Sequence, residues 1–256
     1  MKVTDGEKPV DLLGPQGREV LKKLDRASTL IGLDYDGTIT PIVRDPMAAV
    51  LSDETKAILK NLMKKWQVVI ISGRMRRDLG LLLQQDDLFV TVGSHGAECT
   101  LRKPHEEYEE EVKELVSKWE ALFLDLKQRY PKLILENKGL SFTVHFGMVD
   151  EQREVESEID DRLEALEGNA RIIKGYHVVN LVPAMLPHKG EALVWLMGHY
   201  KKQHALFFGD DITDEFVFKM QNPNITGVRV GEGVSTSAPY YVKNVDDVIA
   251  SLKLLL

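Results

Sequence analysis

The chain has 256 residues, of which 43% are hydrophobic, and 33 Lys and Arg against 40 Asp and Glu give a formal net charge of −7. This hydrophobic content excludes a chain that is disordered throughout, and the length fits one large domain or a core with a smaller second domain. The acidic balance argues against nucleic-acid binding, which usually needs a basic surface.

Cysteine content and hydropathy exclude further classes. The single cysteine, Cys99, excludes a disulfide framework and a multi-cysteine zinc site. No apolar run approaches the roughly 18 residues of a membrane span, and the polar first ten residues are unlike a signal peptide. We therefore expect a cytoplasmic protein with no nucleic-acid and no membrane partner.

Strands and helices alternate through the first hundred residues. Residues 1–16 are polar and contain several Gly and Pro, which predicts a loose lead-in. Compact apolar runs predict buried strands, and Ser52 followed by two acids predicts the start of a helix. The elements expected after the lead-in are helix 17–26, strand 29–33, a helix opened by Ser52, strand 68–71, a helix near 75–84 and strand 88–92. This alternation is typical of a parallel α/β sheet.

The pattern changes at about residue 104. Apolar residues spaced three and four apart predict an amphipathic helix with one buried face, formed by Val112, Leu115, Trp119, Leu122 and Leu126. The elements expected after this helix are strands 133–138 and 141–146, a second helix that ends at Gly168, and strands 171–174 and 177–182. Helix–strand–strand, twice, is typical of a small α+β unit.

From Lys189 the α/β pattern resumes, with helix 189–200 and strand 205–208. We therefore expect a core built from residues 1–103 and 187–256. An α+β cap at residues 104–186 is inserted between these two segments.

Three predicted strands of the core end at polar residues with glycine beside them. These ends read Asp34-Tyr35-Asp36-Gly37-Thr38, Ser72-Gly73-Arg74 and Gly209-Asp210-Asp211. Because ligands of open parallel sheets bind outside the carboxyl ends of the strands, we expect these groups to share one crevice. Asp34 and Asp36, two residues apart in extended chain, should point the same way. The hydroxyl of Ser72 and the backbone N–H groups after it suit a phosphate oxygen.

The charge of this crevice determines what it has to hold. Two like charges ~4 Å apart repel by about 4 kcal/mol at an effective dielectric constant of ~20. Asp34, Asp36 and Asp210 therefore cannot share the crevice as bare carboxylates, still less with a phosphate dianion. A divalent cation that prefers oxygen ligands, Mg2+, removes this repulsion. Lys189, at the start of a predicted helix, is a candidate for a further positive charge.

In chain order these segments resemble the four motifs of the haloacid-dehalogenase superfamily of phosphotransferases. The finer detail resembles the trehalose-6-phosphate phosphatase family of that superfamily. The segments that carry this resemblance are LDYDGTITPIVRDP at 33–46, ISGR at 71–74, GSHGAE at 93–98, Glu136-x-Lys138 with His145-Phe146, Lys189, GDDITDE at 209–215, Val230-Gly231 and Ala238 to Tyr240. The resemblance covers residues 29–256 and implies a Rossmann-like parallel-sheet core with an inserted α+β cap of the C2 type.

The resemblance implies a catalytic role for four residues. Asp34 would be the nucleophile that takes the phosphoryl group as an aspartyl phosphate. Asp36 would protonate the sugar leaving group and then activate water. Ser72 and Lys189 would hold phosphate oxygens, and Lys189 would also neutralise Asp34. Electrostatic clamping and in-line positioning would supply the large acceleration that phosphate monoester hydrolysis needs.

The resemblance also implies a magnesium site. Mg2+ would be bound by a carboxylate oxygen of Asp34, the backbone carbonyl of Asp36 and a carboxylate oxygen of Asp210. Asp211 or Asp214 would lie next to these ligands without binding the ion directly.

Sugar selection is implied mainly for the cap. The residues implied to contact the substrate are Gly73, Arg74, His95, Glu98, Glu136, Lys138, His145 and Asn180. Polar groups that offer both donors and acceptors are what the recognition of sugar hydroxyls requires.

Asn180 departs from the family pattern. Where that family typically has Glu-x-x-Pro, this chain has Asn180 followed by Leu181, Val182 and Pro183. Asparagine keeps an acceptor, adds donors and loses the charge, which is expected to change selectivity by about tenfold or more. Trehalose 6-phosphate is the leading substrate, and glucosylglycerol phosphate or a hexose phosphate is the alternative.

Two other functions fit the same core. A phosphomutase would form the aspartyl phosphate and return the phosphoryl group to a sugar. A phosphosugar-sensing partner of a sugar synthase is disfavoured, because such modules tend to lose the nucleophile or the general acid, and Asp34 and Asp36 are both present. The expected partner is a small-molecule sugar phosphate.

Overall fold

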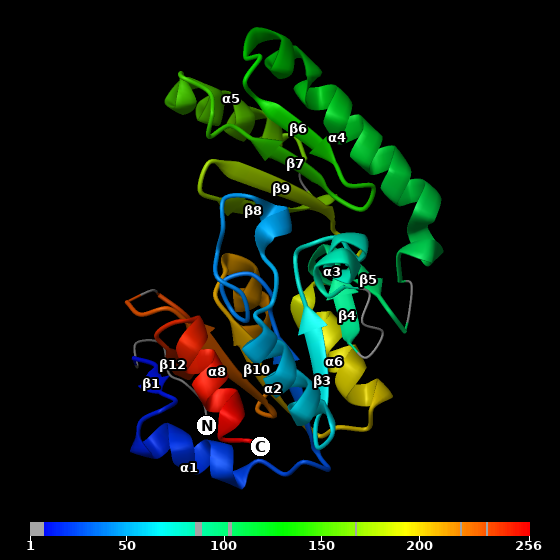
Figure 1. Ribbon diagram of the computed structural model, residues 1–256. Coiled ribbons are helices and arrows are strands. Elements are labelled where there is room, and N and C mark those ends of the chain that lie inside the picture. Colours follow the sequence, from blue (N-terminus) through cyan, green and yellow to red (C-terminus); the bar gives the residue numbers. More distant parts are fainter. Residues whose placement is uncertain (1–7, 85–88, 102–103, 167, 221, 234) are drawn as a thin grey trace. The chain divides into compact units, whose positions relative to one another are not determined.

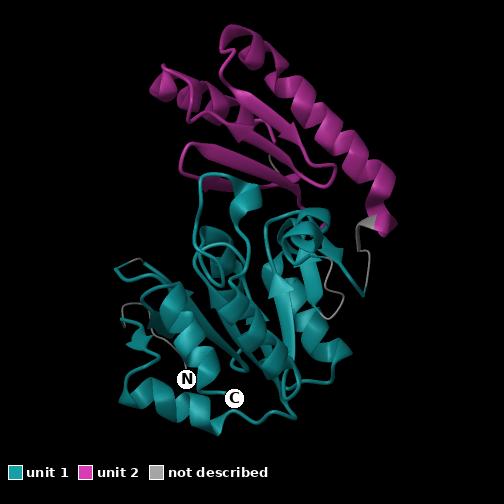
Figure 2. Cartoon of the chain, viewed as in Figure 1, with its two compact units in different colours: residues 1–101, 188–256 teal, residues 102–187 magenta. Residues whose placement is uncertain are grey.

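The structure is a computed structural model that describes residues 8–84, 89–101, 104–166, 168–220, 222–233 and 235–256. The chain divides into two compact units (Figure 2): unit 1 comprises residues 1–101 and 188–256, and unit 2 comprises residues 102–187. Unit 2 thus interrupts unit 1 in the chain, within two residues of the expected boundaries. That unit 1 is a catalytic core and unit 2 a substrate-selecting cap stays a prediction.

Unit 1 is built on an eight-stranded sheet (Figure 1). In spatial order its strands are β1 (Val10–Asp11), β12 (Tyr240–Val242), β11 (Ile225–Val230), β10 (His204–Gly209), β2 (Thr29–Leu33), β3 (Gln67–Ile71), β4 (Val90–Gly93) and β5 (Glu98–Cys99). Neighbouring strands are parallel except β4 and β5, which are antiparallel. The predicted parallel α/β sheet is confirmed. Residue 88, the first of the predicted strand 88–92, lies outside the described residues.

Helices cover both faces of this sheet. The helices of unit 1 are α1 (Pro15–Lys23), α2 (Asp53–Met63), α3 (Arg76–Leu82), α6 (Lys189–His199), α7 (Glu215–Phe218) and α8 (Val245–Lys253), and its 3-10 turns are η1 (Pro46–Ala48), η2 (Ser94–Gly96) and η4 (Ile212–Asp214). The hydroxyl of Ser52 accepts the backbone N–H of Thr55 at 3.0 Å, so the predicted N-cap of α2 is confirmed.

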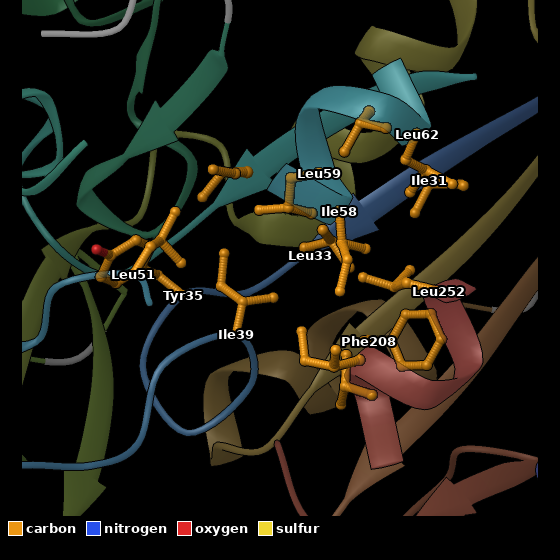
Figure 3. Close-up of a cluster of buried hydrophobic side chains, with 14 of the residues drawn as sticks. Ile31, Leu33, Tyr35, Ile39, Leu51, Ile58, Leu59, Leu62, Phe208 and Leu252 are labelled. Atoms are coloured by element: carbon orange, nitrogen blue, oxygen red, sulfur yellow. The ribbon is translucent and has the colours of Figure 1, made fainter. Parts of the chain in front are cut away.

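Alternation along the strands supplies two apolar layers, one on each side of the sheet. On one side, Leu33 of β2 belongs to a buried cluster with Leu59 of α2 and Leu252 of α8 (Figure 3). On the other side, Phe207 of β10 belongs to a cluster with Leu193 of α6. All five residues of β2 are buried, so the middle of the sheet is fixed by packing on both faces.

Unit 2 is a four-stranded antiparallel sheet with two helices on the same side (Figure 1). In spatial order its strands are β6 (Ile134–Asn137), β7 (Phe142–His145), β9 (Val178–Pro183) and β8 (Ala170–Gly175), and its helices are α4 (Glu109–Arg129) and α5 (Gln152–Glu164), preceded by the 3-10 turn η3 (Pro104–Tyr108). The two helices are adjacent, since Arg162 of α5 donates to the carbonyl of Leu122 of α4 at 3.2 Å. The predicted order helix–strand–strand, repeated, is confirmed.

The predicted loose lead-in is wrong for residues 10–16. Val10 and Asp11 form β1, which pairs with Tyr240 and Tyr241 near the other end of the chain. Leu12 is fully buried. Helix α1 begins at Pro15 rather than at residue 17, because the fixed φ of proline suits the first position of a helix. Residues 1–7 lie outside the described residues.

The buried face of α4 also differs from the prediction. Val112, Trp119 and Leu126 are buried as expected, but Val116 and Phe123 take the places expected for Leu115 and Leu122. A spacing of four, then three, satisfies the helical repeat equally well, so periodicity alone does not choose between neighbouring apolar residues. Contact with the sheet determines which apolar residues of α4 are buried, because the ring of Phe123 stacks on Phe142 of β7 with centroids 5.8 Å apart.

No helix in the described ranges is long and apolar enough to cross a membrane.

The core of unit 2 generates the first prediction. Phe123→Ala removes a fully buried ring and should lower the free energy of unfolding by about 3–5 kcal/mol. Leu124→Ala, the control, changes a neighbouring side chain that is 49% exposed and should cost about 0.5 kcal/mol or less. Urea unfolding followed by circular dichroism and by tryptophan fluorescence measures both. Equal losses would mean that α4 buries a different face.

Candidate active site

Three strand ends meet at one edge of the sheet of unit 1. Strands β10, β2 and β3 are neighbours and parallel, so their carboxyl ends lie together. Asp34 follows β2, Ser72 follows β3 and Asp210 follows β10. The contact of Thr38 with Asp210, 3.2 Å from hydroxyl to Oδ1, joins two of these ends directly.

Three carboxylates gather at this edge. One oxygen each from Asp34, Asp210 and Asp214 lie within 4.8 Å of one another, and Asp34 and Asp214 are buried. Two glycines make room for them. A Cβ at Gly37 would lie 2.0 Å from Oδ2 of Asp210, and one at Gly209 would lie 2.2 Å from Cγ of Asp214. Gly37 also has a φ of +70°, a conformation that favours glycine.

A buried lysine lies between two of these carboxylates. Lys189 is 1% exposed, and its Nζ donates to Oδ1 of Asp34 at 3.0 Å and to Oδ1 of Asp214 at 2.8 Å. It is the first residue of α6, whose start is held by the ring of His188, which accepts the backbone N–H of Gly190 at 3.0 Å. A lysine buried so completely has to be paired with carboxylates, because an unpaired buried charge is costly.

The charges of this cluster are not balanced by the lysine alone. Burial raises the pKa of Asp34 well above its usual value, with Lys189 opposing and Asp214 reinforcing this shift. Burial, together with repulsion from Asp214, raises the pKa of Asp210 to about 6. Burial would lower the pKa of Lys189, but Asp214 and Asp34 outweigh it and raise that pKa. Three carboxylates beside one ammonium group leave two negative charges unbalanced.

The donor set therefore fits a hard cation. Carboxylate oxygens are the ligands that Mg2+ prefers in proteins, and two surplus negative charges are what a divalent ion offsets. Of the two predicted supporting acids, Asp214 belongs to the cluster and Asp211 does not. Asp211 is exposed, and its carboxylate instead accepts the hydroxyl of Thr213 at 3.2 Å, while its backbone N–H donates to Asp214 at 2.9 Å.

Asp36 has a different partner from Asp34. Its two carboxylate oxygens accept from Nε and Nη2 of Arg74, at 2.5 and 2.6 Å. Arg74 lies two residues after Ser72, which is 2% exposed and whose hydroxyl accepts the backbone N–H of Arg74 at 3.2 Å. The motifs predict that Arg74 lies near the substrate but do not predict this pair, because no local pattern links positions 36 and 74.

The GSHGAE loop packs against the end of β3. The imidazole of His95 lies on Gly73, where a Cβ would be 2.5 Å from Cε1. Ser94 and His95 both have positive φ, of 49° and 59°, so the loop makes a tight turn here. Oε2 of Glu98 accepts the hydroxyl of Ser94 and the backbone N–H of Arg76, both at 2.8 Å, which ties the loop to the start of α3.

The predicted sugar-binding residues of unit 2 lie on one face of its sheet. Oε2 of Glu136 is 3.2 Å from Nε2 of His145 and 3.3 Å from Nζ of Lys138. Directly opposite residues of paired strands share a face, and the register pairs Glu136 with Thr143 and Thr143 with Asn180. Thr143, which sequence analysis did not select, donates its hydroxyl to Oδ1 of Asn180 at 2.8 Å.

The fold of unit 1 and the charged residues at the carboxyl edge of its sheet indicate the class of protein. A doubly wound parallel sheet with a carboxylate cluster and a buried lysine at its carboxyl edge is the haloacid-dehalogenase type of core. A solved haloacid dehalogenase-like hydrolase from B. subtilis shares the fold, with a TM-score of 0.60 at 14% identity over 89% of this chain and 99% of that one.

The family within this class follows from comparison. The trehalose-phosphatase family model matches residues 32–246, and the chain belongs to this family. The chain is 26% identical to a protein of Arabidopsis thaliana described as probable trehalose-phosphate phosphatase E, over 93% of this chain and 73% of that protein. The C-terminal domain of trehalose-6-phosphate phosphatase from C. albicans superposes with a TM-score of 0.75 at 24% identity, over 97% of this chain and 98% of that one. The resemblance predicted from the motifs is confirmed.

The raised pKa of Asp210 generates a second prediction. In the metal-free protein folded Asp210 loses its proton near pH 6, and the unfolded chain does so near 3.8. The contribution of Asp210 to stability therefore falls as the pH rises through this window, by about 2–3 kcal/mol in total. Asp210→Asn should raise the free energy of unfolding of the metal-free protein by about this amount at pH 7.5 and by little below pH 4.

Thermal or urea unfolding in EDTA at both pH values measures this difference. Asp161→Asn, which changes an exposed acid of unit 2, serves as the control. Destabilisation by Asp210→Asn at pH 7.5 would contradict the view that the carboxylates repel one another there.

Proposed function

We propose that the protein is a Mg2+-dependent phosphoric monoester hydrolase that acts on a sugar phosphate, with trehalose 6-phosphate as the leading substrate. One observation carries the proposal: Lys189 is buried between Asp34 and Asp214 beside Asp210, at the carboxyl edge of the sheet of a trehalose-phosphatase family member. A location in the reducing cytoplasm agrees with the single free Cys99.

Asp34 is the nucleophile of the proposed reaction. One of its carboxylate oxygens attacks phosphorus, and the bond from phosphorus to the sugar oxygen breaks. The sugar oxygen takes a proton from Asp36. A water molecule then attacks the phosphorus of the aspartyl phosphate and gives its proton to Asp36, the bond from phosphorus to Asp34 breaks, and inorganic phosphate leaves.

Lys189 and Ser72 stabilise the charge of the phosphoryl group. Lys189 already donates to Asp34, so its ammonium group lies beside the attacking oxygen and favours the ionised form of that carboxylate. Asp214 holds the lysine from the other side, at 2.8 Å. Ser72, at the end of the neighbouring strand, supplies a hydroxyl and adjacent backbone N–H groups for phosphate oxygens.

The residues that would hold Mg2+ are Asp34 and Asp210 through their carboxylates and Asp36 through its backbone carbonyl, with Asp214 beside them. A bound Mg2+ supplies charge neutralisation at the phosphoryl oxygens. The three carboxylates within 4.8 Å of one another support this assignment.

Selection of the sugar is assigned to the polar face of unit 2, formed by Glu136, Lys138, His145 and Asn180. His95 and Glu98 of unit 1 stay predicted substrate-binding residues. Glu136, Lys138 and His145 offer acceptors and donors close together. Asn180 is the reason for a second candidate substrate class. Because Thr143 donates to its Oδ1, the amide presents its Nδ2 as a donor, where a glutamate would present only acceptors. Glucosylglycerol phosphate or a hexose phosphate is therefore the alternative substrate.

Phosphate release from a panel of phosphosugars tests the proposed function. The native protein should release phosphate with Mg2+ and not with EDTA. Asp34→Asn keeps the shape of a buried side chain and removes the nucleophile, so turnover should fall by about 10⁴-fold or more while the circular dichroism spectrum is unchanged.

Metal-independent release, or near-native turnover by Asp34→Asn, would contradict the proposal. A mutase would instead pass labelled phosphate into an isomeric sugar phosphate. A regulatory partner would bind phosphosugars without releasing phosphate.

Asn180→Glu tests the assignment of the polar face. Replacing a donor by a charged acceptor should change the ratio of kcat/KM between trehalose 6-phosphate and the alternative phosphosugars by about tenfold or more. Phosphate release with Mg2+ should persist, because the chemistry belongs to unit 1. Gln128→Glu, which adds the same charge at an exposed position of α4, is the control. An unaltered ratio in Asn180→Glu would remove Asn180 from the site.

A further inference from the structure

Arg74 binds both oxygens of Asp36, which are the oxygens that the proposed reaction needs. The distances are 2.5 Å from Nε to Oδ2 and 2.6 Å from Nη2 to Oδ1. Parallel N–H to oxygen bonds of this kind are the strongest form of arginine–carboxylate pair. The Arg74 side chain is 14% exposed and that of Asp36 is 36% exposed, so the pair is only partly screened by water.

The guanidinium of Arg74 also packs against an aromatic ring. It lies over the ring of Tyr35, 5.8 Å from its centroid. Tyr35 is fully buried, and its hydroxyl donates to the carbonyl of Ala49 at 2.8 Å. The backbone N–H of Arg74 donates to the hydroxyl of Ser72. Arg74 is thus held by Tyr35 at its guanidinium and by Ser72 at its backbone, and Asp36 is the more exposed member of the pair.

This arrangement conflicts with the task assigned to Asp36. A carboxylate that accepts from arginine on both oxygens keeps free lone pairs, but it cannot turn toward a leaving group or a water without breaking one of these bonds. The phosphate of the substrate is expected beside Ser72, two residues before Arg74. A phosphate dianion offers a guanidinium the same two-oxygen geometry as a carboxylate, with more charge.

We propose that Arg74 is a positioning residue that holds Asp36 in the resting protein and exchanges it for the phosphate of the substrate. The exchange frees the Asp36 carboxylate when phosphate is in place, so that it can take a proton from solvent water and pass it to the leaving oxygen, and it couples the general acid to occupancy of the phosphate site. The proposal rests on the proposed function for the role of Asp36. Its ligand is the phosphate group, whichever sugar carries it.

Phosphate binding tests the exchange without turnover. Isothermal titration with inorganic phosphate in the presence of Mg2+ should give Asp36→Asn an affinity about tenfold higher than the native protein, because the guanidinium no longer has a competing carboxylate. Arg74→Ala should lower the affinity by about tenfold or more. In the double variant Arg74→Ala, Asp36→Asn, the gain from Asp36→Asn should disappear.

The double variant separates competition from a simple loss of negative charge. If Asp36→Asn raises the affinity equally with and without Arg74, the exchange is wrong. Asp78→Asn is the control, since Asp78 acts on Arg74 through charge but is bonded to Arg77. It should change phosphate affinity by less than about twofold.

Kinetics with a hydrolysed phosphosugar give an independent readout. Arg74→Ala should raise KM by about tenfold or more and change kcat by less than about fivefold, and Arg74→Lys should restore part of the KM. A fall in kcat at unchanged KM would make Arg74 a permanent support of Asp36 and overturn the exchange. Absence of turnover in the native protein would contradict the proposed function alone, because the phosphate titrations test the exchange by themselves.

Discussion

The ammonium group of Lys189 is the interaction on which unit 1 depends at its functional edge. It bridges Asp34, 155 positions earlier in the chain, and Asp214, 25 positions later. Placing three charged groups out of water is costly, and removing one partner would leave an uncompensated buried charge, so each needs the others. The bridge therefore joins the two segments of unit 1 that unit 2 separates in the chain, and it does so where the proposed nucleophile lies.

The sheet explains why the bridge forms at this edge and not elsewhere. Residues at the ends of β2 and β10 are brought side by side by parallel pairing, from Ala205 with Leu30 to Phe208 with Leu33. Burial of all of β2 between two layers of helices leaves little freedom for Asp34, which follows it directly. Gly37 and Gly209 then remove the two Cβ atoms that would occupy the space of Asp210 and Asp214. Apolar packing thus sets the distances between the charged groups.

Local patterns in the sequence predicted the strands that end at the site and the residues on them. They succeed where the signal is contained in a few consecutive residues, as in the apolar run before Asp34. They fail where partners are distant: β1 is only two residues long and exists through its pairing with β12, and the buried face of α4 is chosen by Phe142. The pairing of Arg74 with Asp36 is not predictable for the same reason. The sequence predicts a separate role for each residue, and only the fold brings the two side chains together.

Counting the charges of unit 1 at this edge explains why a phosphate group has to compete for its partners. Asp34, Asp36, Asp210 and Asp214 contribute four negative charges against one each from Lys189 and Arg74, which leaves a surplus of two. A divalent cation cancels that surplus but creates no excess of positive charge. Lys189 keeps one N–H for a phosphate oxygen beside its two carboxylate bonds, whereas Arg74 can bind phosphate through Nε and Nη2 only by giving up Asp36. Lys189 is fully enclosed, whereas the Asp36 member of the other pair is partly exposed. The pair of Arg74 and Asp36 is therefore the one whose opening costs least, and its opening would release Asp36, the proposed general acid.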